Sequence, residues 1–253
     1  MTPSRRLDYA ERWLRDGLEV CRPAAQFLTL DIDMTRPRAL LQIARQRGIR
    51  VTYTHILVRA AALALAAHPE LHQMVCGSRL HHPNQVDIGL SVAGESFVAP
   101  VLVIENAAGK NLPALSEEIA RRTPEIQAAD RRMLQTLRRW GWLLPFGILR
   151  RTLLRCLFRS AKFRRKGTGT FQVSIVPEVD EAFTSLFTTS AILVAGRVRD
   201  RVVAVEGLPA VRPTVTLSCS ADHRVWDGKA AQRFLLAVRQ ALEETELGLC
   251  ISE

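Results

Sequence analysis

The sequence predicts a mixed α/β fold, because segments of helical and strand periodicity alternate along its 253 residues. Helical patterns over residues 5–20, 37–48 and 52–68 surround a strand pattern over 26–34. Several apolar strand patterns follow, and the last of them leads directly into a C-terminal helix. An apolar content of 47% is enough for a substantial core in a chain of this length. A mixed sheet with flanking helices is therefore expected.

The N-terminal elements are each supported by their residue pattern. Residues 5–20 place apolar side chains on one helical stripe with charges opposite, and residues 26–34 alternate as a strand. The helix over 37–48 is expected to end at Gly48, with Arg45 and Arg47 in its last turn, where cations favour the negative end of the helix dipole. The segment 52–68 is rich in Ala and Leu and predicts a buried helix.

The middle of the chain predicts strands. Residues 85–93 and 97–104 are apolar runs joined by Gly-Glu-Ser, which is consistent with a hairpin, and 111–122 predicts a helix. The segment 167–176 opens with glycines and becomes an alternating strand, and 191–198 and 201–206 add two more. No internal repeat is evident, so a single domain is expected over 1–253.

The net charge of +10 is concentrated in one segment. Residues 131–166 hold twelve Arg or Lys and no Asp or Glu, so the rest of the chain carries a net charge of about −2. The segment also contains an apolar stretch over 140–149, but this is interrupted by Pro145 and Gly147 and is too short to span a bilayer. The basic character belongs to this insert and not to the whole fold.

The cysteines and the N-terminal residues indicate which metal sites, disulfides and cellular compartment to expect. Five cysteines without a CxxC pair suggest neither a zinc site nor a disulfide framework, so no metal is expected. The N-terminus has no apolar block of the kind found in a signal peptide. A cytoplasmic protein is expected, with possible peripheral attachment to a membrane.

A strand is predicted over residues 214–218, and His223 follows it in a turn before the C-terminal helix. The histidine lies within the run Ser218–Phe234 (SCSADHRVWDGKAAQRF). Histidine suits a general base, because its ordinary pKa of about 6.5 leaves it largely neutral at neutral pH. Asp227 and Gly228 follow at fixed spacing, and Asp227 could orient the imidazole. Cys219 could form a nucleophile pair with His223, but strand alternation favours a buried core cysteine.

His-Arg-Val-Trp-Asp-Gly resembles the HxxxDG motif of the acyltransferase (E2) catalytic domains of 2-oxoacid dehydrogenase complexes, which are related to chloramphenicol acetyltransferases. Four further segments match collinearly: the first helix with Arg6, the helix ending in His68-Pro-Glu-Leu, the hairpin of residues 85–104, and the strand that carries Ser174. The chain departs from the family pattern at His72, where asparagine is usual, and in the loop after Ser174. His55 and His68 are interpreted as packing or capping residues.

The resemblance implies a chloramphenicol acetyltransferase-like sandwich that transfers an acyl group from coenzyme A or a related pantetheine or lipoyl thioester. His223 would be the base and the hydroxyl of Ser174 would stabilise the oxyanion. Asp227 would be structural and pair with an arginine, for which Arg6, Arg12 and Arg224 are candidates. The resemblance also implies a trimer in which the histidine of one subunit faces the serine of the next. Lipoyl and subunit-binding domains are expected to be absent, so the acyl partner would be a separate acyl carrier or lipoyl protein.

The basic insert leaves several interpretations open. Arg151, Arg155, Arg159, Lys162 and Lys166 would form one stripe of a helix, with an apolar stripe opposite. Such a helix suits an anionic membrane surface or an acidic carrier protein, and equally a helical hairpin packed on the core with a solvated arginine face. Nucleic acid is not expected, because aromatic residues are too sparse. Two alternatives to a soluble acyltransferase remain: an assembly protein without catalysis, and a membrane-surface enzyme that modifies lipids.

Overall fold

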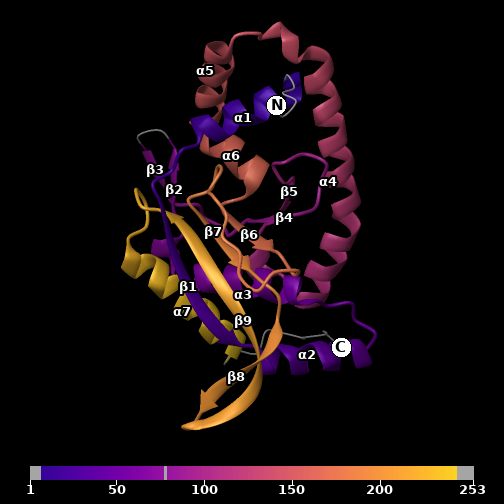
Figure 1. The fold of residues 1–253 in the computed structure, drawn as a ribbon, viewed down its shortest axis with the longest axis vertical. Helices are drawn as coiled ribbons and strands as arrows, with labels where there is room; N and C mark the ends of the chain where they lie inside the picture. The colour runs from indigo at the N-terminus through magenta and orange to yellow at the C-terminus, as the bar shows by residue number, and fades with distance from the viewer. Residues whose placement is uncertain (1–6, 77–78, 244–253) are drawn as a thin grey trace, which may run out of the picture.

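The computed structural model describes residues 7–76 and 79–243 as a mixed sheet with helices packed against it (Figure 1). The helices are α1 (Tyr9–Val20), α2 (Thr35–Gln46), α3 (Tyr53–Ala67), α4 (Leu112–Trp140), α5 (Gly147–Phe158), α6 (Ala161–Thr168) and α7 (Gly228–Glu243). The strands are β1 (Ala25–Asp33), β2 (Met74–Cys76), β3 (Arg79–His81), β4 (Ile88–Ser91), β5 (Val101–Ile104), β6 (Phe171–Ile175), β7 (Ala191–Ala195), β8 (Arg199–Val205) and β9 (Leu208–Asp222). Single-turn 3-10 helices lie at η1 (Pro69–Leu71), η2 (Ala107–Gly109) and η3 (Gly141–Leu143).

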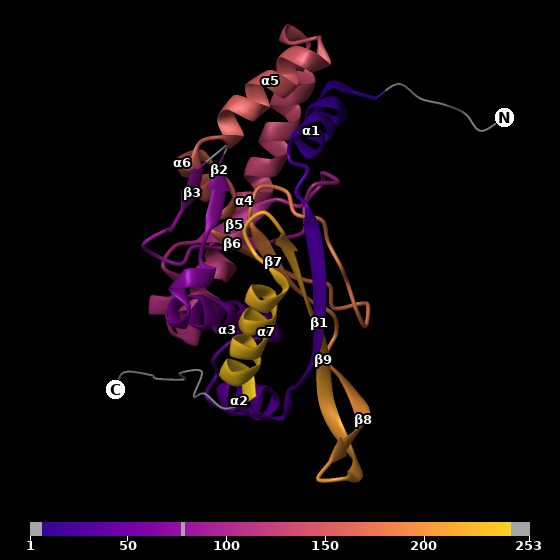
Figure 2. The same ribbon diagram turned by 90° about the vertical axis from the view of Figure 1, so that its left-hand side faces the viewer.

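The central sheet has the strand order β1-β9-β7-β6-β4-β5, and β8 pairs with the first part of β9. The pairs β4–β6 and β6–β7 are parallel, while the other pairs are antiparallel. The predicted mixed α/β class with a central mixed sheet is therefore confirmed. β8 and its hairpin partner extend beyond the body of the molecule (Figure 2).

One face of the sheet carries the main core. α3 and α7 lie on this face (Figure 2), and Leu217, Cys219 and Ala221 of β9 pack there with both helices. α3 begins with a capping box, in which His55 Nδ1 accepts a hydrogen bond from the Thr52 N–H at 2.9 Å. His55 is therefore the capping residue that the sequence indicated.

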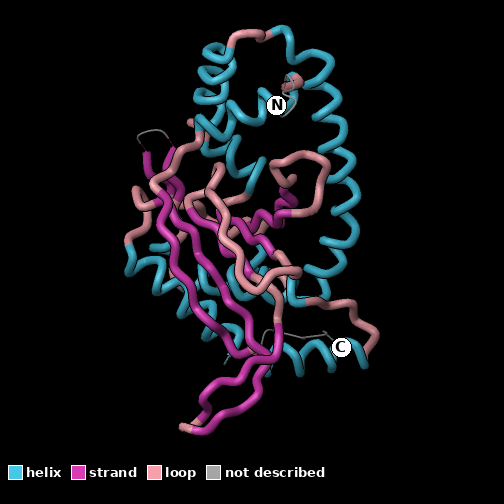
Figure 3. Tube along the Cα trace, in the orientation of Figure 1, coloured by secondary structure: helices cyan, strands magenta, loops and turns pink. Residues whose placement is uncertain are grey.

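The opposite face of the sheet is partly covered by residues 176–190, which run between β6 and β7 as a loop (Figure 3). Leu186 of this loop packs on Ile192 and Val194 in a small second cluster. The hydroxyl of Ser218 donates a hydrogen bond to the Ala182 carbonyl of the same loop. Alternation along the strands places Ser174, Val194 and Ser218 on this second face, in one row across β6, β7 and β9.

Several sequence predictions need correction. The predicted helix 111–122 continues to Trp140, so it includes residues 131–140 of the insert. The predicted single stripe from Arg151 to Lys166 is divided, because α5 ends at Phe158 and Ser160 caps a new helix, α6. The β2–β3 hairpin was not predicted, and β9 is longer than the strand expected at 214–218.

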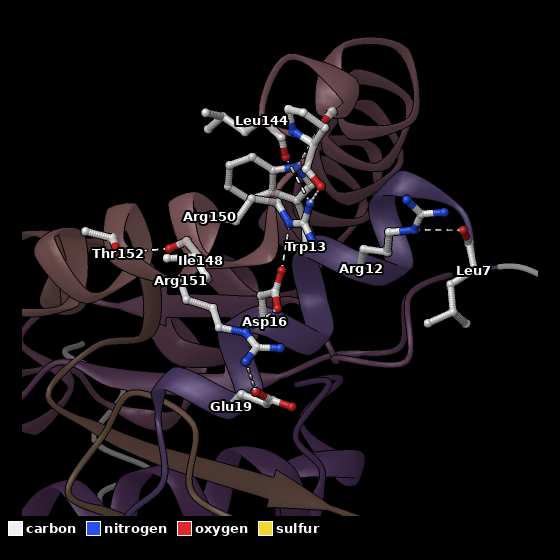
Figure 4. Close-up of polar contacts among 12 residues, drawn as sticks. Leu7, Arg12, Trp13, Asp16, Glu19, Leu144, Ile148, Arg150, Arg151 and Thr152 are labelled. Carbon is white, nitrogen blue, oxygen red and sulfur yellow. Dashed lines mark hydrogen bonds and ion pairs between the residues drawn. The ribbon is translucent and has the colours of Figure 1, made fainter.

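The insert is held to α1 by buried charges (Figure 4). The Asp16 carboxylate is 5% exposed and receives Arg150 Nε at 2.6 Å and Arg151 Nε at 2.7 Å. Arg150 Nη1 also donates to the carbonyls of Leu144 and Pro145, each at 2.9 Å. On the same helix, Trp13 Nε1 donates to the Gly141 carbonyl at 3.3 Å (Figure 4).

A second anchor joins α6 to the sheet. Arg165 Nε forms an ion pair with Asp87, whose side chain is 1% exposed, and Arg164 donates to the Thr188 and Val75 carbonyls. The residues of the predicted basic stripe are exposed apart from Arg151, which is partly buried. Arg150 and Arg164, which lie outside that stripe, are buried. No helix among residues 7–76 and 79–243 is both long and apolar enough to cross a membrane.

Candidate acyl-transfer site

His223 is the first residue of the turn that connects β9 to α7. Its backbone N–H donates to the Ala24 carbonyl at 2.7 Å, which extends the β1–β9 ladder by one hydrogen bond. Its side chain is exposed, and within the part of the chain that the structure describes no hydrogen bond involves the imidazole. The backbone is thus fixed while the ring remains accessible to a substrate or to another subunit.

The turn after His223 is anchored by its neighbours on both sides. Asp222 is 2% exposed and accepts hydrogen bonds from the backbone N–H and the guanidinium of Arg224, the shortest at 2.6 Å. This pairing raises the pKa of the Arg224 guanidinium, chiefly through the hydrogen bond to Asp222. Trp226 is buried between Phe171 and Phe234, and its carbonyl accepts from Gln26 Nε2 at 2.7 Å.

Asp227 caps α7, because its Oδ1 accepts the backbone N–H of Ala230 at 2.7 Å. The side chain is exposed and points to the helix rather than to the imidazole of His223. Among the described residues no arginine forms an ion pair with it: Arg224 pairs with Asp222, and Arg12 donates to the Leu7 carbonyl. The predicted pairing of Asp227 with an arginine is therefore wrong for Arg12 and Arg224, while Arg6 lies outside the described residues.

Gly228 is the first residue of α7. A Cβ placed there would meet no described atom within 4 Å, and its φ is not in the left-handed region. Local sterics therefore do not explain the glycine of the motif. It leaves open space beside the helix N-terminus.

Ser174 lies near the C-terminal end of β6 and is partly exposed. Gly169, with φ +75°, makes the turn into this strand, because a Cβ there would come within 2.6 Å of the Asp87 carbonyl. Ser174 pairs with Val194, and Val194 pairs with Ser218, so the serine stands two strands away from β9. Two strand spacings correspond to about 10 Å.

His223 and Ser174 therefore do not meet within one chain. His223 follows Ser218 by five residues, which adds about 16 Å along the strand direction. Neither side chain is long enough to bridge this separation. A site that uses both groups needs them from two different chains.

Cys219 is not a nucleophile in this structure. It belongs to the main core, and burial raises the pKa of its thiol to about 12. The expectation of a core cysteine is confirmed, and the alternative Cys/His pair is excluded because a protonated, buried thiol is unreactive. Within the described residues no group of His, Cys, Asp or Glu side chains could hold a metal ion.

A cavity beside the turn was missed by the sequence analysis. Its volume is about 270 Å³, and Asp222 and Arg224, the two neighbours of His223, both line it. Further arginines reach it from the α1–β1 connection, α5 and α6. The concentration of arginine in the insert was visible in the sequence, but its approach to the motif depends on how α5 and α6 pack.

Comparison with known structures supports the architecture. The chain aligns over 96% of its length with 92% of dihydrolipoamide acetyltransferase from Azotobacter vinelandii, with a TM-score of 0.72 and 19% identity. That structure was used to investigate the role of a serine, a histidine and an asparagine in the catalytic mechanism. A probable dihydrolipoamide acetyltransferase from Listeria monocytogenes aligns with a TM-score of 0.69 and 20% identity, over 97% of this chain and 98% of that one.

Sequence relatives point to the same family. The chain is 29% identical, over 86% of its length, to 49% of the dihydrolipoyllysine-residue acetyltransferase component of the acetoin cleaving system of Bacillus subtilis. It is 24% identical, over 95% of its length, to 55% of the succinyltransferase component of the 2-oxoglutarate dehydrogenase complex of Rickettsia bellii. The chain thus spans about half the length of these relatives.

The family model for the 2-oxoacid dehydrogenases acyltransferase catalytic domain matches residues 23–133 and 178–250. The second range contains His223, Asp227 and Gly228. The unmatched residues 134–177 contain most of the insert and also Ser174. Because the two matched ranges cover most of the sequence, the chain belongs to the family of 2-oxoacid dehydrogenase acyltransferase catalytic domains.

Proposed function

We propose that the chain is an acyltransferase that moves an acyl group between a coenzyme A thioester, or a related pantetheine or lipoyl thioester, and an acceptor thiol. The observation that carries this proposal is the exposed His223, held by its backbone within the matched part of the family model. Family membership supports acyl transfer as the reaction class. The choice of coenzyme A and the roles of individual residues are our own assignment.

In the proposed reaction, His223 removes the proton from the acceptor thiol and the thiolate attacks the carbonyl carbon of the thioester. The tetrahedral intermediate carries an oxyanion, which accepts a hydrogen bond from the Ser174 hydroxyl. The intermediate then collapses, the carbon–sulfur bond of the donor breaks, and the imidazolium returns its proton to the leaving thiolate. The acyl group is exchanged and no net proton is gained or lost.

We further propose that Ser174 comes from a second copy of the chain in a homotrimer or a multiple of trimers. The separation of His223 and Ser174 within one chain supports this arrangement. The hairpin of β8 and β9 offers a surface for contact between copies, because Val202, Leu208 and Val211 are each about 70% exposed. One of the solved structures that the chain resembles is the cubic core of a pyruvate dehydrogenase multienzyme complex.

The test is acyl transfer from acetyl-, succinyl- and isobutyryl-coenzyme A to dihydrolipoamide. His223→Ala should reduce the rate by about 10²–10⁴-fold and Ser174→Ala by about 10²–10³-fold. Undiminished activity in His223→Ala would overturn the assignment. An intact oligomer of the wild-type chain that neither transfers acyl groups nor binds coenzyme A would instead favour the assembly protein without catalysis.

The partner that carries the acyl group is proposed to be a separate lipoyl protein or acyl carrier protein. The relatives named above are components of multienzyme systems that act on dihydrolipoyllysine residues. A lipoylated protein domain should therefore accept acyl groups with a KM well below that of free dihydrolipoamide.

A second candidate function places a cytoplasmic enzyme at an anionic membrane surface, where it would modify a lipid. The tip of the insert supports it, because Trp142, Phe146 and Ile148 are 52%, 68% and 79% exposed. Arg138 and Arg139 lie in the last turn of α4 beside this tip. Aromatic and aliphatic side chains beside arginines suit the boundary between head groups and acyl chains.

Co-sedimentation with vesicles of phosphatidylglycerol and phosphatidylcholine tests the membrane proposal. The wild-type chain should sediment with anionic vesicles at low salt, and Trp142→Ala/Phe146→Ala/Ile148→Ala should not. The matched control replaces Leu80, Phe97 and Val179 by alanine, which removes exposed apolar surface outside both the insert and the β8–β9 hairpin. Equal sedimentation of both triple variants would show that the tip of the insert does not bind the membrane.

A further inference from the structure

The cavity beside His223 carries an unbalanced positive charge. Five arginines line it, against a single carboxylate, that of Asp222. Asp222 is already engaged by Arg224 through both of its oxygens. The cavity therefore has a formal excess of four positive charges.

The arginines differ in burial. Arg164 is only 9% exposed; its Nε donates to the Thr188 carbonyl, and its Nη1 donates to the Val75 carbonyl and to the Cys76 sulfur. No carboxylate forms an ion pair with Arg155, Arg159 or Arg164 in the part of the chain that the structure describes. A buried cation without a counter-charge is costly, and a bound anion would compensate it.

The arrangement suits a phosphate or a carboxylate. Arg155 lies in the last turn of α5 and Arg159, four residues on, is the C-cap of the same helix, so both lie on one side of it. Arg224 and Arg164 approach from the turn and from α6. Guanidinium groups bind such oxyanions through paired hydrogen bonds. Cys21 lines the cavity together with Arg164 and Arg224. Burial raises the pKa of its thiol to about 11, and the positive charges of the two arginines oppose that shift in part.

An apolar groove of about 540 Å³ adjoins this cavity. It is lined mainly by Trp13 and Leu14 of α1, Ile126 and Met133 of α4, and Leu154 of α5. Phe158 and Phe187 line both the groove and the arginine cavity and pack edge to face at 5.6 Å. The two spaces thus share a wall of two aromatic rings, and the groove has the size of a small-molecule site.

We propose that the cavity and the groove together bind one anionic amphiphile, with its phosphate or carboxylate on the arginines and its apolar acyl chain in the groove. The charge of the cavity and the apolar lining of the groove each select one half of such a ligand. The proposal rests on the proposed function for the role of the ligand, as an acyl substrate of the site at His223. It assigns to the insert the selection of medium- or long-chain acyl groups.

Binding is measured separately from catalysis, by titration calorimetry of His223→Ala with four probes below their micelle concentrations. The probes are lauroyl-coenzyme A, free laurate, coenzyme A without a chain, and lauroyl-pantetheine without a phosphate. Lauroyl-coenzyme A should bind at least about 100-fold more tightly than coenzyme A, since each buried methylene contributes about three- to four-fold. If laurate binds as tightly as lauroyl-coenzyme A, the head group that the arginines bind is a carboxylate. If lauroyl-coenzyme A binds while laurate and lauroyl-pantetheine do not, the head group is a phosphate.

Variants test each half of the site. Arg159→Ala should weaken binding of lauroyl-coenzyme A by about ten-fold or more, because a charge-assisted contact is lost. Ala129→Trp should weaken binding of the lauroyl probes by filling the groove, of which Ala129 forms part of the wall. Arg131→Ala is the matched control, because it removes one charge of the insert outside the cavity, where Arg131 lies 4.0 Å from Glu95. The affinity of this variant for lauroyl-coenzyme A should stay within about two-fold of that of the His223→Ala protein.

Four results would overturn the proposal. Two concern the probes: equal affinity for lauroyl-coenzyme A and coenzyme A, and equal affinity for lauroyl probes with and without a phosphate or carboxylate. Two concern the variants: an equal loss of lauroyl-coenzyme A affinity in Arg159→Ala and Arg131→Ala, and dissociation of the oligomer by Ala129→Trp. The last would show that a second copy of the chain occupies the groove. Failure of lauroyl binding with normal transfer of acetyl groups would remove this proposal alone, whereas normal binding without any acyl transfer would remove only the proposed function.

Discussion

At the scale of single residues, the turn of His223 is held by main-chain contacts and by the side chains on either side of it. The histidine backbone bonds to Ala24, Asp222 is paired with Arg224, and Trp226 is buried. Asp227 contributes by capping α7 and not by orienting the imidazole. The two aspartates of the motif region therefore have different energetic roles.

Replacing Asp227 by alanine should lower the free energy of unfolding by only about 1 kcal/mol, because it removes one exposed helix cap. Asp222→Ala should cost about 2 kcal/mol or more, because it removes several hydrogen bonds to the Arg224 cation from a buried position. Urea unfolding of the two variants measures the difference. A larger loss of unfolding free energy in Asp227→Ala than in Asp222→Ala would show that Asp227, and not Asp222, holds the turn in place.

His72 should make stability depend on pH. Its imidazole is buried and lies 2.6 Å from the Thr170 hydroxyl, and burial lowers its pKa from 6.5 to about 4. A folded-state pKa below the unfolded value means that the unfolded chain binds more protons, so this contribution is full above pH 6.5 and is lost as the pH falls towards 4. The loss is at most about 3 kcal/mol.

His72→Asn removes this titration. Between pH 7 and pH 4 the variant should lose less unfolding free energy than the wild-type chain, as measured by urea unfolding at both pH values. Equal losses in the two proteins would show that His72 does not stay neutral in the folded state.

The sequence pointed to His223, Asp227 and Gly228 because they lie within one short motif. The predicted arginine partner of Asp227 is absent among the described residues, because residue spacing does not show which hydrogen bonds a side chain makes at the start of a helix.

The arginine cavity could not be predicted from the sequence for a related reason. Its lining residues come from six separate segments, and only the packing of α5 and α6 brings the arginines of the insert to the turn.

At the scale of elements, α1 and α5 are joined by a buried ion pair (Figure 4). Asp16→Ala should lower the free energy of unfolding by about 3–5 kcal/mol, because it leaves the buried Arg150 cation without its partner. Arg138→Ala is the matched control, since its ion pair with Asp8 is exposed and should contribute less than about 1 kcal/mol. Equal effects of the two substitutions on urea unfolding would show that the insert is not anchored through Asp16.

Most helices and strands could be predicted because their periodicity is strong, as in α3 and in the strand before His223. The full length of α4 was missed because residues 131–140 were assigned to a separate basic insert and residues 123–130 were assigned to no element. The division between α5 and α6 was missed because the apolar spacing continues across Ser160, whose capping role depends on a single hydrogen bond to Phe163. Short strands such as β2 and β3 carry too few residues for a periodicity to be read.

At the scale of the whole molecule, the order of strands in the sheet decides where the two proposed catalytic groups lie. β6 and β9 are separated by β7, and His223 lies beyond the end of β9. A single copy of the chain therefore presents the base and the hydroxyl at two distant positions. The account predicts that each active site is completed by a neighbouring copy.

Complementation between two inactive variants tests this claim most directly. His223→Ala and Ser174→Ala are each assayed alone, then mixed, dissociated and reassembled, and assayed again for acyl transfer. The account predicts little activity for either variant alone and about a quarter of wild-type activity for the equal mixture, because about one interface in four joins an intact histidine to an intact serine. A mixture as inactive as its two components, with reassembly confirmed, would contradict an active site shared between copies of this chain.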